Sequence, residues 1–547
     1  MIQSPVAHDT HLNDAQWTGT RYVVREDDFQ TFDLKLKENM EIQFKGKTNI
    51  TNAASLDEEL SSSLSNEIQS EALVDELYSC INNACKSTFR TTGGKKRLKG
   101  RTVPWWTMDL MIQRKKVNAM RRRYQRTQNE DQRQLRKTQY MQEKRAYQSQ
   151  IQQEKIKSWK TFCTVTEGSN PWGTVYKIAS GKLKNMTNLS TMQKADGTYT
   201  ENLESTIVYM LDHFAPNDDT KEDNSYQEEV RNGTNNPDTN DDVAFTQQEL
   251  QTALKNFNPR NAPGADGITS DILLRAFNLF PMFFTTLYNK CLSEGCFPNR
   301  WKRSTIIPIV KPGKEQSREV SKYRPISLID VGGKLLEKLL IDRILYHAFS
   351  NNYMNKSQFG FTPQKGAIDA AMEVKQFIEG SIKDKGSVIA VSLDVRGAFD
   401  AAWWPRILLN IKDIKCPKNL YRLTQSYFTN RYSTLRTNTC VVTKEVSKGC
   451  PQGSCCGPGF WNIMYNSVLN LQFSKQTYVA AFADDLIVLS KGSSHTEAEN
   501  YANSDINKIE TWARNNKVEF NENKSKVLLI TKKRKEYNKQ VNVYLRK

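Results

Sequence analysis

Apolar runs of strand length mark the second half of the chain. One run spans 478–489 and is interrupted at its centre by Asp484 and Asp485. Two β-branched, aromatic-rich segments on either side of a short polar step are typical of a β-hairpin, so we expect both carboxylates at its tip. An ordinary turn would also use aspartate. Two like charges beside a core strand are costly to desolvate, however, and a bound cation would relieve that cost.

A second strand-like run, 387–393, ends on Asp394. A carboxylate at a strand end and a carboxylate pair at a hairpin tip can share divalent ions, and Mg²⁺ prefers carboxylate and phosphate oxygens. A third run, 305–310, leads to Lys311, and Arg324 precedes a further apolar segment. Cations at strand ends beside Gly/Pro turns suit a triphosphate, although surface cations produce the same pattern.

Helical periodicity dominates an earlier segment, 105–160, which contains neither Gly nor Pro. Its apolar spacing predicts two long helices, interrupted near 129–131. Over 91–160 there are 20 Lys+Arg against 5 Asp+Glu. A solvated helix face usually mixes signs, so this excess favours contact with nucleic-acid phosphates. The candidate nucleic-acid-binding residues are Arg114, Lys115, Lys116, Arg121, Arg122 and Arg123.

Changes in composition predict four segments. Residues 1–100 are weakly informative, and 101–215 form a basic, mostly helical extension. Residues 216–243 are acidic and poor in apolar side chains, which predicts a flexible linker. Residues 244–547 form the main domain, with its core at 291–532.

The charge of the whole chain narrows the class of partner. The 547 residues include 78 Lys+Arg and 60 Asp+Glu, a net charge of +18. This excess favours a polyanion, either nucleic acid or an anionic membrane surface. No apolar run of about 20 residues is present and the first residues lack the pattern of a signal peptide, so we expect an intracellular protein without a membrane span. The ten cysteines show neither a disulfide framework nor zinc-ligand spacing.

Taken in order, the motifs resemble those of the reverse transcriptases of non-LTR (LINE-type) retrotransposons. SLDVRGAFD around Asp394 resembles the first catalytic aspartate motif, PQG (451–453) the nucleotide-contacting segment, and FADD (482–485) the paired-aspartate motif. APGADG, VKPGK, YRPISL and QFGF resemble the finger motifs. The resemblance is greatest to the Pol polyproteins of type-one retrotransposable elements of arthropod ribosomal RNA genes.

The resemblance implies an α+β fold, with the palm and fingers of a right-hand polymerase after the basic helical extension. It implies RNA-directed DNA synthesis from dNTPs on an RNA template, primed by nicked target DNA. Two Mg²⁺ ions, with Mn²⁺ as an alternative, would serve nucleotidyl transfer. The chain ends about where the primer-gripping motif should begin, so we expect no thumb. We also expect an internal piece of a longer polyprotein with an upstream endonuclease, acting in the nucleus during integration.

The resemblance also implies a role for each site residue. The implied catalytic and metal-binding positions are Asp394, Asp484, Asp485 and Lys524, with the backbone carbonyl of Val395 as a further metal ligand. The lysine would protonate the leaving pyrophosphate. The implied nucleotide-binding positions are Lys311, Arg324, Phe399, Gln452 and Gly453. The two cations would clamp the triphosphate, the phenylalanine would reject a 2′-hydroxyl, and the last two would contact nucleotide and template.

Two alternatives stay open at this point. An RNA-dependent RNA polymerase shares the polymerase chemistry, although Phe399 at the gate position argues against it. A nucleic-acid-binding fragment that is catalytically incomplete fits the expected absence of a thumb. The sequence gives no oligomeric state.

Overall fold

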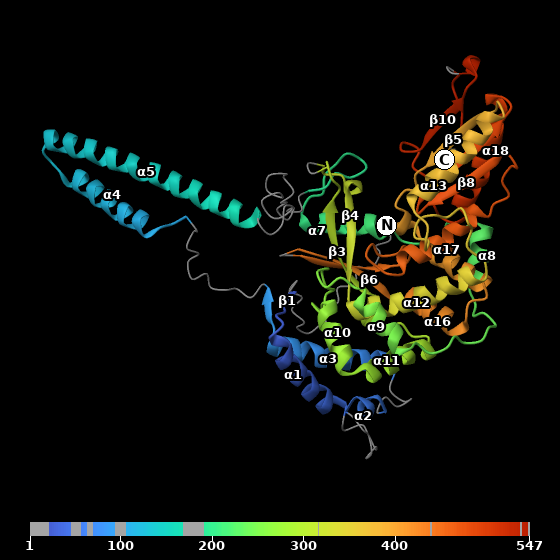
Figure 1. Ribbon diagram of the computed structural model, residues 1–547, viewed down its shortest axis with the longest axis horizontal. Coiled ribbons are helices and arrows are strands. Elements are labelled where there is room, and N and C mark those ends of the chain that lie inside the picture. The colour runs from blue at the N-terminus through green and yellow to red at the C-terminus, as the bar shows by residue number, and fades with distance from the viewer. Residues whose placement is uncertain are drawn as a thin grey trace. The chain divides into compact units, whose positions relative to one another are not determined.

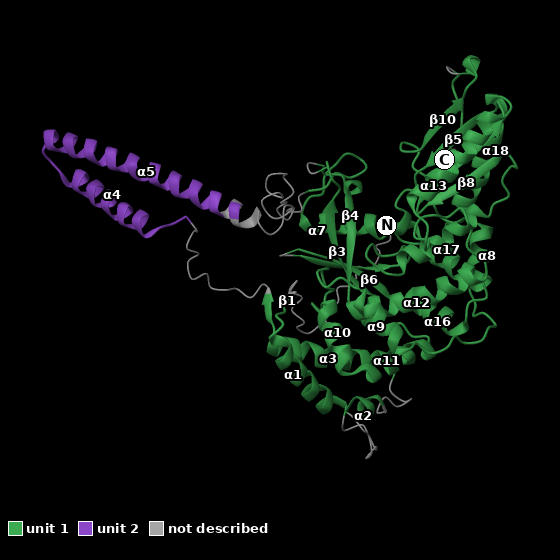
Figure 2. Ribbon diagram, in the orientation of Figure 1, with its two compact units in different colours: residues 1–93, 190–547 green, residues 94–189 purple. Residues whose placement is uncertain are grey.

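The computed structural model describes most of the chain (Figure 1). The described residues are 21–44, 56–62, 69–92, 105–167, 191–314, 317–437, 440–536 and 539–544. The chain divides into two compact units, one of residues 1–93 with 190–547 and the other of residues 94–189 (Figure 2). Within the described ranges, no helix is both long enough and apolar enough to cross a membrane.

The first unit mixes strands and helices. Its strands are β1 (Arg21–Val23), β2 (Arg90–Thr92), β3 (Arg303–Val310), β4 (Tyr323–Ile329), β5 (Ser387–Leu393), β6 (Arg431–Arg436), β7 (Val441–Val446), β8 (Thr477–Phe482), β9 (Asp485–Gly492) and β10 (Lys526–Thr531). Its helices are α1 (Asp28–Phe44), α2 (Leu56–Ser62), α3 (Ser70–Thr88), α7 (Leu203–Phe214), α8 (Ser225–Asn232), α9 (Gln247–Lys255), α10 (Ser270–Leu279), α11 (Pro281–Glu294), α12 (Val331–Ser350), α13 (Ala367–Lys383), α14 (Ala398–Ala401), α15 (Trp404–Asp413), α16 (Lys418–Tyr427), α17 (Gly457–Leu469) and α18 (His495–Asn515). Short 3₁₀ turns are η2 (Asn299–Lys302), η3 (Val320–Lys322) and η4 (Arg534–Glu536).

The sheet that carries the predicted aspartates has the order β10-β5-β9-β8 and is antiparallel throughout. Helices α13 and α18 pack on it. The inner strand β5 is buried at five of its seven residues and reads as an almost continuous apolar run. Strand β5 and the β8–β9 hairpin form where the apolar pattern predicted them.

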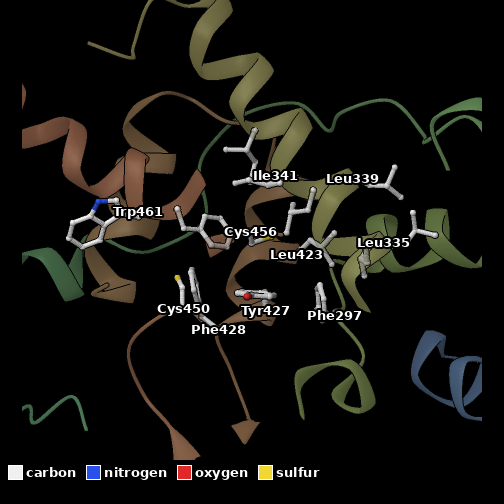
Figure 3. Close-up of a cluster of buried hydrophobic side chains, with 14 of the residues drawn as sticks. Phe297, Leu335, Leu339, Ile341, Leu423, Tyr427, Phe428, Cys450, Cys456 and Trp461 are labelled. Atoms are coloured by element: carbon white, nitrogen blue, oxygen red, sulfur yellow. The ribbon is translucent and has the colours of Figure 1, made fainter. Parts of the chain in front are cut away.

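The second four-stranded sheet has the order β4-β3-β6-β7. β3 pairs antiparallel with β4 and parallel with β6, while β6 and β7 form a hairpin. A buried cluster beneath it joins α12, α16 and α17 to the loop that carries PQG (Figure 3). The residues labelled there are Phe297, Leu335, Leu339, Ile341, Leu423, Tyr427, Phe428, Cys450, Cys456 and Trp461. Because this core is shared, the PQG loop has a fixed support.

The weakly informative segment, 1–100, contributes to the same unit in its described part. Helices α2 and α3 pack on α11, and α1 contacts α10. Side chains such as Phe32 and Leu73 are fully buried. Asp57 in α2 caps α11 by accepting hydrogen bonds from the backbone N–H groups of Met282 and Phe283 at 2.9 and 3.0 Å. These helices therefore extend the core around α10 and α11.

The prediction of a flexible linker over 216–243 is wrong. This segment contains α8, and two of its carboxylates are paired with Arg231 in the same segment or with Lys517 far away in the sequence. Asp218 lies 2.9 Å from Arg231 and 2.6 Å from the Lys517 ammonium. Asp223 lies 2.5 Å from the same ammonium. Composition suggested a solvated acidic chain, but these carboxylates are buried against residues that lie far away in the sequence.

The second unit is a helical hairpin of α4 (Met108–Arg126) and α5 (Glu130–Glu167), with the break close to the predicted place. Tyr124 stacks on Tyr140 at 6.2 Å between ring centroids, and Lys116 lies 2.7 Å from Glu143. The predicted limit of the basic extension at residue 215 is wrong. Helix α7 belongs to the first unit because its apolar side chains pack on β6 and β7.

Candidate active site

The β8–β9 hairpin presents the two adjacent aspartates at its tip. Phe482 pairs with Asp485, which leaves Ala483 and Asp484 to form the turn. Ala483 has φ +59°, a left-handed conformation that costs a residue with a Cβ about 1 kcal/mol or more. Contacts from the surrounding structure must therefore hold this turn.

Asp394 joins the pair through the register of the sheet. Leu393 at the end of β5 pairs with Leu486 in β9, so Asp394 follows at the position beside Asp485. The carbonyl oxygen of Asp394 accepts a hydrogen bond from the backbone N–H of Asn521 at 2.7 Å. The Lys524 ammonium, in the turn before β10, donates to Asp394 Oδ2 at 3.0 Å. The predicted catalytic residues thus gather at one end of the sheet.

Burial and mutual repulsion govern the protonation of this group. Burial is the largest cause that raises the pKa of Asp484, and the charges of Asp485 and Asp394 raise it further. Burial, followed by the charge of Asp394, raises the pKa of Asp485. Lys524 acts in the opposite direction on both. A cation placed among these carboxylates would favour their ionised forms.

The three carboxylates are ligands that suit a hard cation, but their side chains are not arranged around a common point as they would be in a metal centre. Among the described residues, no three acidic, histidine or cysteine side chains stand ready to hold a metal ion. Carboxylate oxygens are the ligands that Mg²⁺ and similar ions prefer. The ammonium of Lys524 at Asp394 supplies the kind of positive charge that a metal ion would bring. Val395, whose carbonyl the sequence predicts as a ligand, is buried and pairs with Phe520.

The predicted phosphate-binding cations lie at the end of the β3–β4 hairpin where the loop joins the two strands. Arg324 pairs with Ile309 across the hairpin and is exposed. Lys311 follows β3, and its ammonium donates to the carbonyl oxygen of Ser321 at 2.8 Å. Burial lowers the pKa of Lys311, and the charges of Lys524 and Arg324 lower it further. Because the charge of Lys524 acts on Lys311, the hairpin cations lie within electrostatic range of the carboxylate end of the other sheet.

The PQG loop lies beside β4, at the edge of the β4-β3-β6-β7 sheet. The carbonyl oxygen of Gln452 accepts a hydrogen bond from the Ser327 N–H at 2.8 Å. Gly453 has φ +127°, and a Cβ there would lie 2.6 Å from the Ser327 carbonyl oxygen. Only glycine meets both demands. Phe399 is joined to this loop because its carbonyl oxygen accepts from the Cys450 N–H at 2.7 Å.

Sequence reasoning missed a buried carboxylate that anchors this loop. Glu337 in α12 is 0 % exposed. Its Oε2 accepts hydrogen bonds from Ser454 Oγ at 2.9 Å and from the Cys455 N–H at 2.7 Å. Its place on the apolar face of α12, at helical spacing from Leu340, Ile341 and Ile344, was the available signal, because a buried charge needs partners.

The six predicted nucleic-acid-binding residues belong to the other unit. Arg114 through Lys116 and Arg121 through Arg123 lie on α4, and all six are exposed. Lys116 is paired with Glu143, and Arg114 stacks over Trp106 at 5.8 Å from the ring centroid. They form a basic helix surface of their own.

Asp400 is a further group that the sequence did not single out. Burial raises its pKa to about 7, against the opposing charges of Lys311 and Lys448. Between pH 4 and 7 the folded chain therefore binds more protons at this carboxyl than the unfolded chain does. By linkage, this site lowers the stability of the folded state as pH rises through that window.

We predict that Asp400→Asn removes this loss. The free energy of unfolding of the variant, minus that of the wild type, should grow as pH rises from about 4 to about 7 and then level off. Urea unfolding at a series of pH values measures it. Asp384→Asn, at an exposed carboxylate, serves as the control and should show no such rise. A pH-independent difference for Asp400→Asn would contradict the prediction.

Comparisons with known proteins agree with this geometry. A family model described as "Reverse transcriptase (RNA-dependent DNA polymerase)" matches residues 309–543. The "Retrovirus-related Pol polyprotein from type-1 retrotransposable element R1" of Bradysia coprophila is 28% identical over 430 residues, which cover 78% of this chain and 41% of that protein. The "RNA-directed DNA polymerase from mobile element jockey" of Drosophila funebris is 30% identical over 279 residues, which cover 49% of this chain and 30% of that protein.

The chain spans less than half the length of these relatives. Among solved structures, the apo telomerase of Candida tropicalis truncated from its C-terminal domain has a TM-score of 0.34 at 12% identity, over 42% of this chain and 50% of that one. That likeness is too low to support an argument. The sequence comparisons carry the conclusion: residues 309–543 match the reverse transcriptase family model, and the chain is similar to a Pol polyprotein of a type-1 retrotransposable element and to the RNA-directed DNA polymerase of the mobile element jockey.

Proposed function

We propose that this chain is the RNA-directed DNA polymerase portion of a non-LTR retrotransposon Pol protein. One observation carries the proposal: Asp394, Asp484, Asp485 and Lys524 come together at one end of an antiparallel sheet, inside the matched reverse transcriptase region. In this proposal the β10-β5-β9-β8 sheet is the palm. The β4-β3-β6-β7 sheet with its neighbouring helices forms the fingers.

The carboxylates would hold two Mg²⁺ ions, with Mn²⁺ as a substitute. Asp394 and Asp484 would be the principal ligands, assisted by the Val395 carbonyl and, more weakly, by Asp485. When bound, such ions activate a primer 3′-hydroxyl and neutralise charge on the leaving pyrophosphate. Lys524 would leave Asp394 as the ions bind, and its ammonium would give a proton to the pyrophosphate.

The remaining site residues would bind and select the nucleotide. Lys311 and Arg324 carry positive charge that would orient the triphosphate toward the carboxylates. The partly buried ring of Phe399 packs at 6.2 Å from Phe361 and would clash with a ribose 2′-hydroxyl. Gln452 and Gly453 would contact the nucleotide and template from a loop fixed on β4.

The natural template and primer follow from the relatives. Their names place them in retrotransposable elements. The template would therefore be the element's own RNA, and the primer a nicked strand of target DNA in the nucleus. A catalytically incomplete fragment and an RNA-dependent RNA polymerase are the competing functions.

The central prediction concerns the two principal carboxylates. Asp394→Asn and Asp484→Asn should each lower Mg²⁺-dependent primer extension at least about a hundredfold, because an amide is a poor ligand for a hard cation. RNA retention on a filter should stay unchanged. Asp384→Asn is the exposed control and should extend like the wild type. A wild-type chain that retains RNA but never extends a primer would favour the incomplete fragment.

A second prediction concerns the sugar of the incoming nucleotide. Phe399→Val should raise the incorporation of NTP relative to dNTP about tenfold or more, because the smaller side chain leaves room for a 2′-hydroxyl. Competition between NTP and dNTP on poly(A)/oligo(dT) measures the ratio. Phe377→Val is the control, since that ring stacks on Tyr478 instead. A wild type that prefers NTP would support an RNA polymerase.

We also propose that the α4–α5 hairpin binds nucleic-acid phosphates. Between 105 and 167 there are 15 Lys+Arg against 6 Asp+Glu, a net +9. Arg121, Arg122 and Arg123 are exposed on α4. Contacts of this kind give affinity without sequence preference.

Replacing Arg121, Arg122 and Arg123 together by alanine should weaken RNA binding. It should also reduce the slope of log affinity against log salt by about 2, since each phosphate contact contributes about 0.7–0.9. Fluorescence anisotropy at several salt concentrations measures both. The control replaces the exposed Lys37, Lys86 and Lys255, which removes the same charge. Equal effects of the two triple variants would show that net charge alone is responsible.

A further inference from the structure

The turn that carries Asp484 is gripped by a side chain from another segment. Gln358, only 1 % exposed, lies in the connection between α12 and α13. Its Oε1 accepts hydrogen bonds from the Ala483 N–H at 3.2 Å and the Gly360 N–H at 3.0 Å. Its Nε2 donates to the Ala483 carbonyl oxygen at 3.4 Å. One amide side chain thus engages both backbone polar groups of the turn residue.

Helix α17 supports the same turn from its own position. Trp461 and Tyr465 are both 0 % exposed and stack on each other at 4.9 Å. The indole N–H of Trp461 donates to the Ala483 carbonyl oxygen at 3.3 Å. The hydroxyl of Tyr465 donates to the Asp484 carbonyl oxygen at 3.4 Å. The turn is therefore held on its backbone, which leaves the Asp484 carboxylate available.

Backbone packing fixes Gln358 against the hairpin. The Phe359 N–H donates to the Ala481 carbonyl oxygen at 2.8 Å, and the Ala481 N–H donates to the Ser357 carbonyl oxygen at 2.9 Å. A Cβ on Gly360 would lie 2.1 Å from the Ala483 nitrogen. Because backbone atoms cannot move aside as a flexible side chain can, only glycine permits this approach.

These contacts explain the unusual conformation of Ala483. A left-handed alanine needs compensation from its surroundings, and here both of its backbone polar groups are engaged by buried side chains. The next residue is Asp484, so a small rotation of the Ala483 peptide would swing that carboxylate away from Asp394. The position of the Asp484 carboxylate relative to Asp394 therefore depends on the conformation of this single peptide.

We propose that Gln358, assisted by Trp461, is a positioning residue that sets the Asp484 carboxylate for binding a divalent cation. This inference rests on the proposed function, because it takes the three carboxylates to be the cation site. Gln358 itself touches neither substrate nor cation. It acts through the Ala483 peptide.

The test compares the wild-type chain with Gln358→Met, Trp461→Phe and a control, Asn419→Ala. Asn419 is a buried amide on α16 that bonds both backbone polar groups of Asp242, each at 2.9 Å, and so matches the way Gln358 bonds Ala483. Hydrogen–deuterium exchange of a peptide over 479–486 reports on the clamp. Mn²⁺ titration followed by electron paramagnetic resonance reports on the cation site, with Asp484→Asn marking its loss.

We expect Gln358→Met to speed exchange at the turn and to weaken Mn²⁺ binding about tenfold or more, as is usual when a support of a metal ligand is lost. Trp461→Phe, which keeps the ring but not the N–H, should act in the same direction and less strongly. Asn419→Ala should leave both measurements at the wild-type values. The kcat of extension should fall in Gln358→Met with little change in KM for dNTP.

The outcomes separate this inference from the proposed function. Unchanged exchange and unchanged Mn²⁺ affinity in Gln358→Met would overturn the positioning role, even if the wild type is an active polymerase. So would equal losses in Asn419→Ala, which would reveal general destabilisation. A wild type that binds Mn²⁺ and loses it in Gln358→Met, yet never extends a primer, would support the positioning role and overturn the proposed function. If Asp484→Asn removes no Mn²⁺ binding from the wild type, both the positioning role and the proposed function are overturned.

Discussion

Repulsion among Asp394, Asp484 and Asp485 is the constraint to which this part of the molecule responds. Burial and the neighbouring negative charges raise the pKa of Asp484 and of Asp485, and the group can stay together only if the backbone beneath it cannot relax. The antiparallel register of β5 and β9 fixes one side, and the grip on Ala483 fixes the other. Lys524 then offsets part of the charge from the turn before β10.

The supports of the aspartate turn and of the PQG loop share one design. Gln358 holds the aspartate turn, and Glu337 holds the loop after PQG, in each case through a buried polar side chain that bonds backbone groups. Such bonds cost little once formed, but leaving either partner unpaired in the interior is expensive. Both loops are therefore held in one conformation through their backbone groups. The apolar core that α12, α16 and α17 share keeps these two supports at a fixed position relative to each other (Figure 3).

The pattern of apolar residues within a segment was sufficient to predict where several strands and helices form. The period of apolar residues predicted β5, the β8–β9 hairpin and the break between α4 and α5, since the residues of each segment carry the pattern, although the partners of β5 lie about a hundred positions or more away. The linker prediction failed because the partner of Asp218 is Lys517, 299 positions away, and composition cannot reveal such a pair. The bond between Gln358 and Ala483 spans 125 positions and was missed for the same reason. The assembly of the site was foreseeable only through the order of its motifs, which is a property of the family.

The ion pairs around Lys517 bear on how the reverse transcriptase region can be isolated. The matched region starts at 309, yet Lys517, 15 % exposed in its side chain, is neutralised by Asp218 and Asp223, which precede that boundary. A fragment cut at the family boundary would lose both counter-charges together with the segment that covers this ammonium. It would also bare the surface of α15 on which α8 packs. The folding unit is thus larger than the unit of sequence similarity, and the acidic stretch before residue 244 acts as an internal counterion for the domain that follows it.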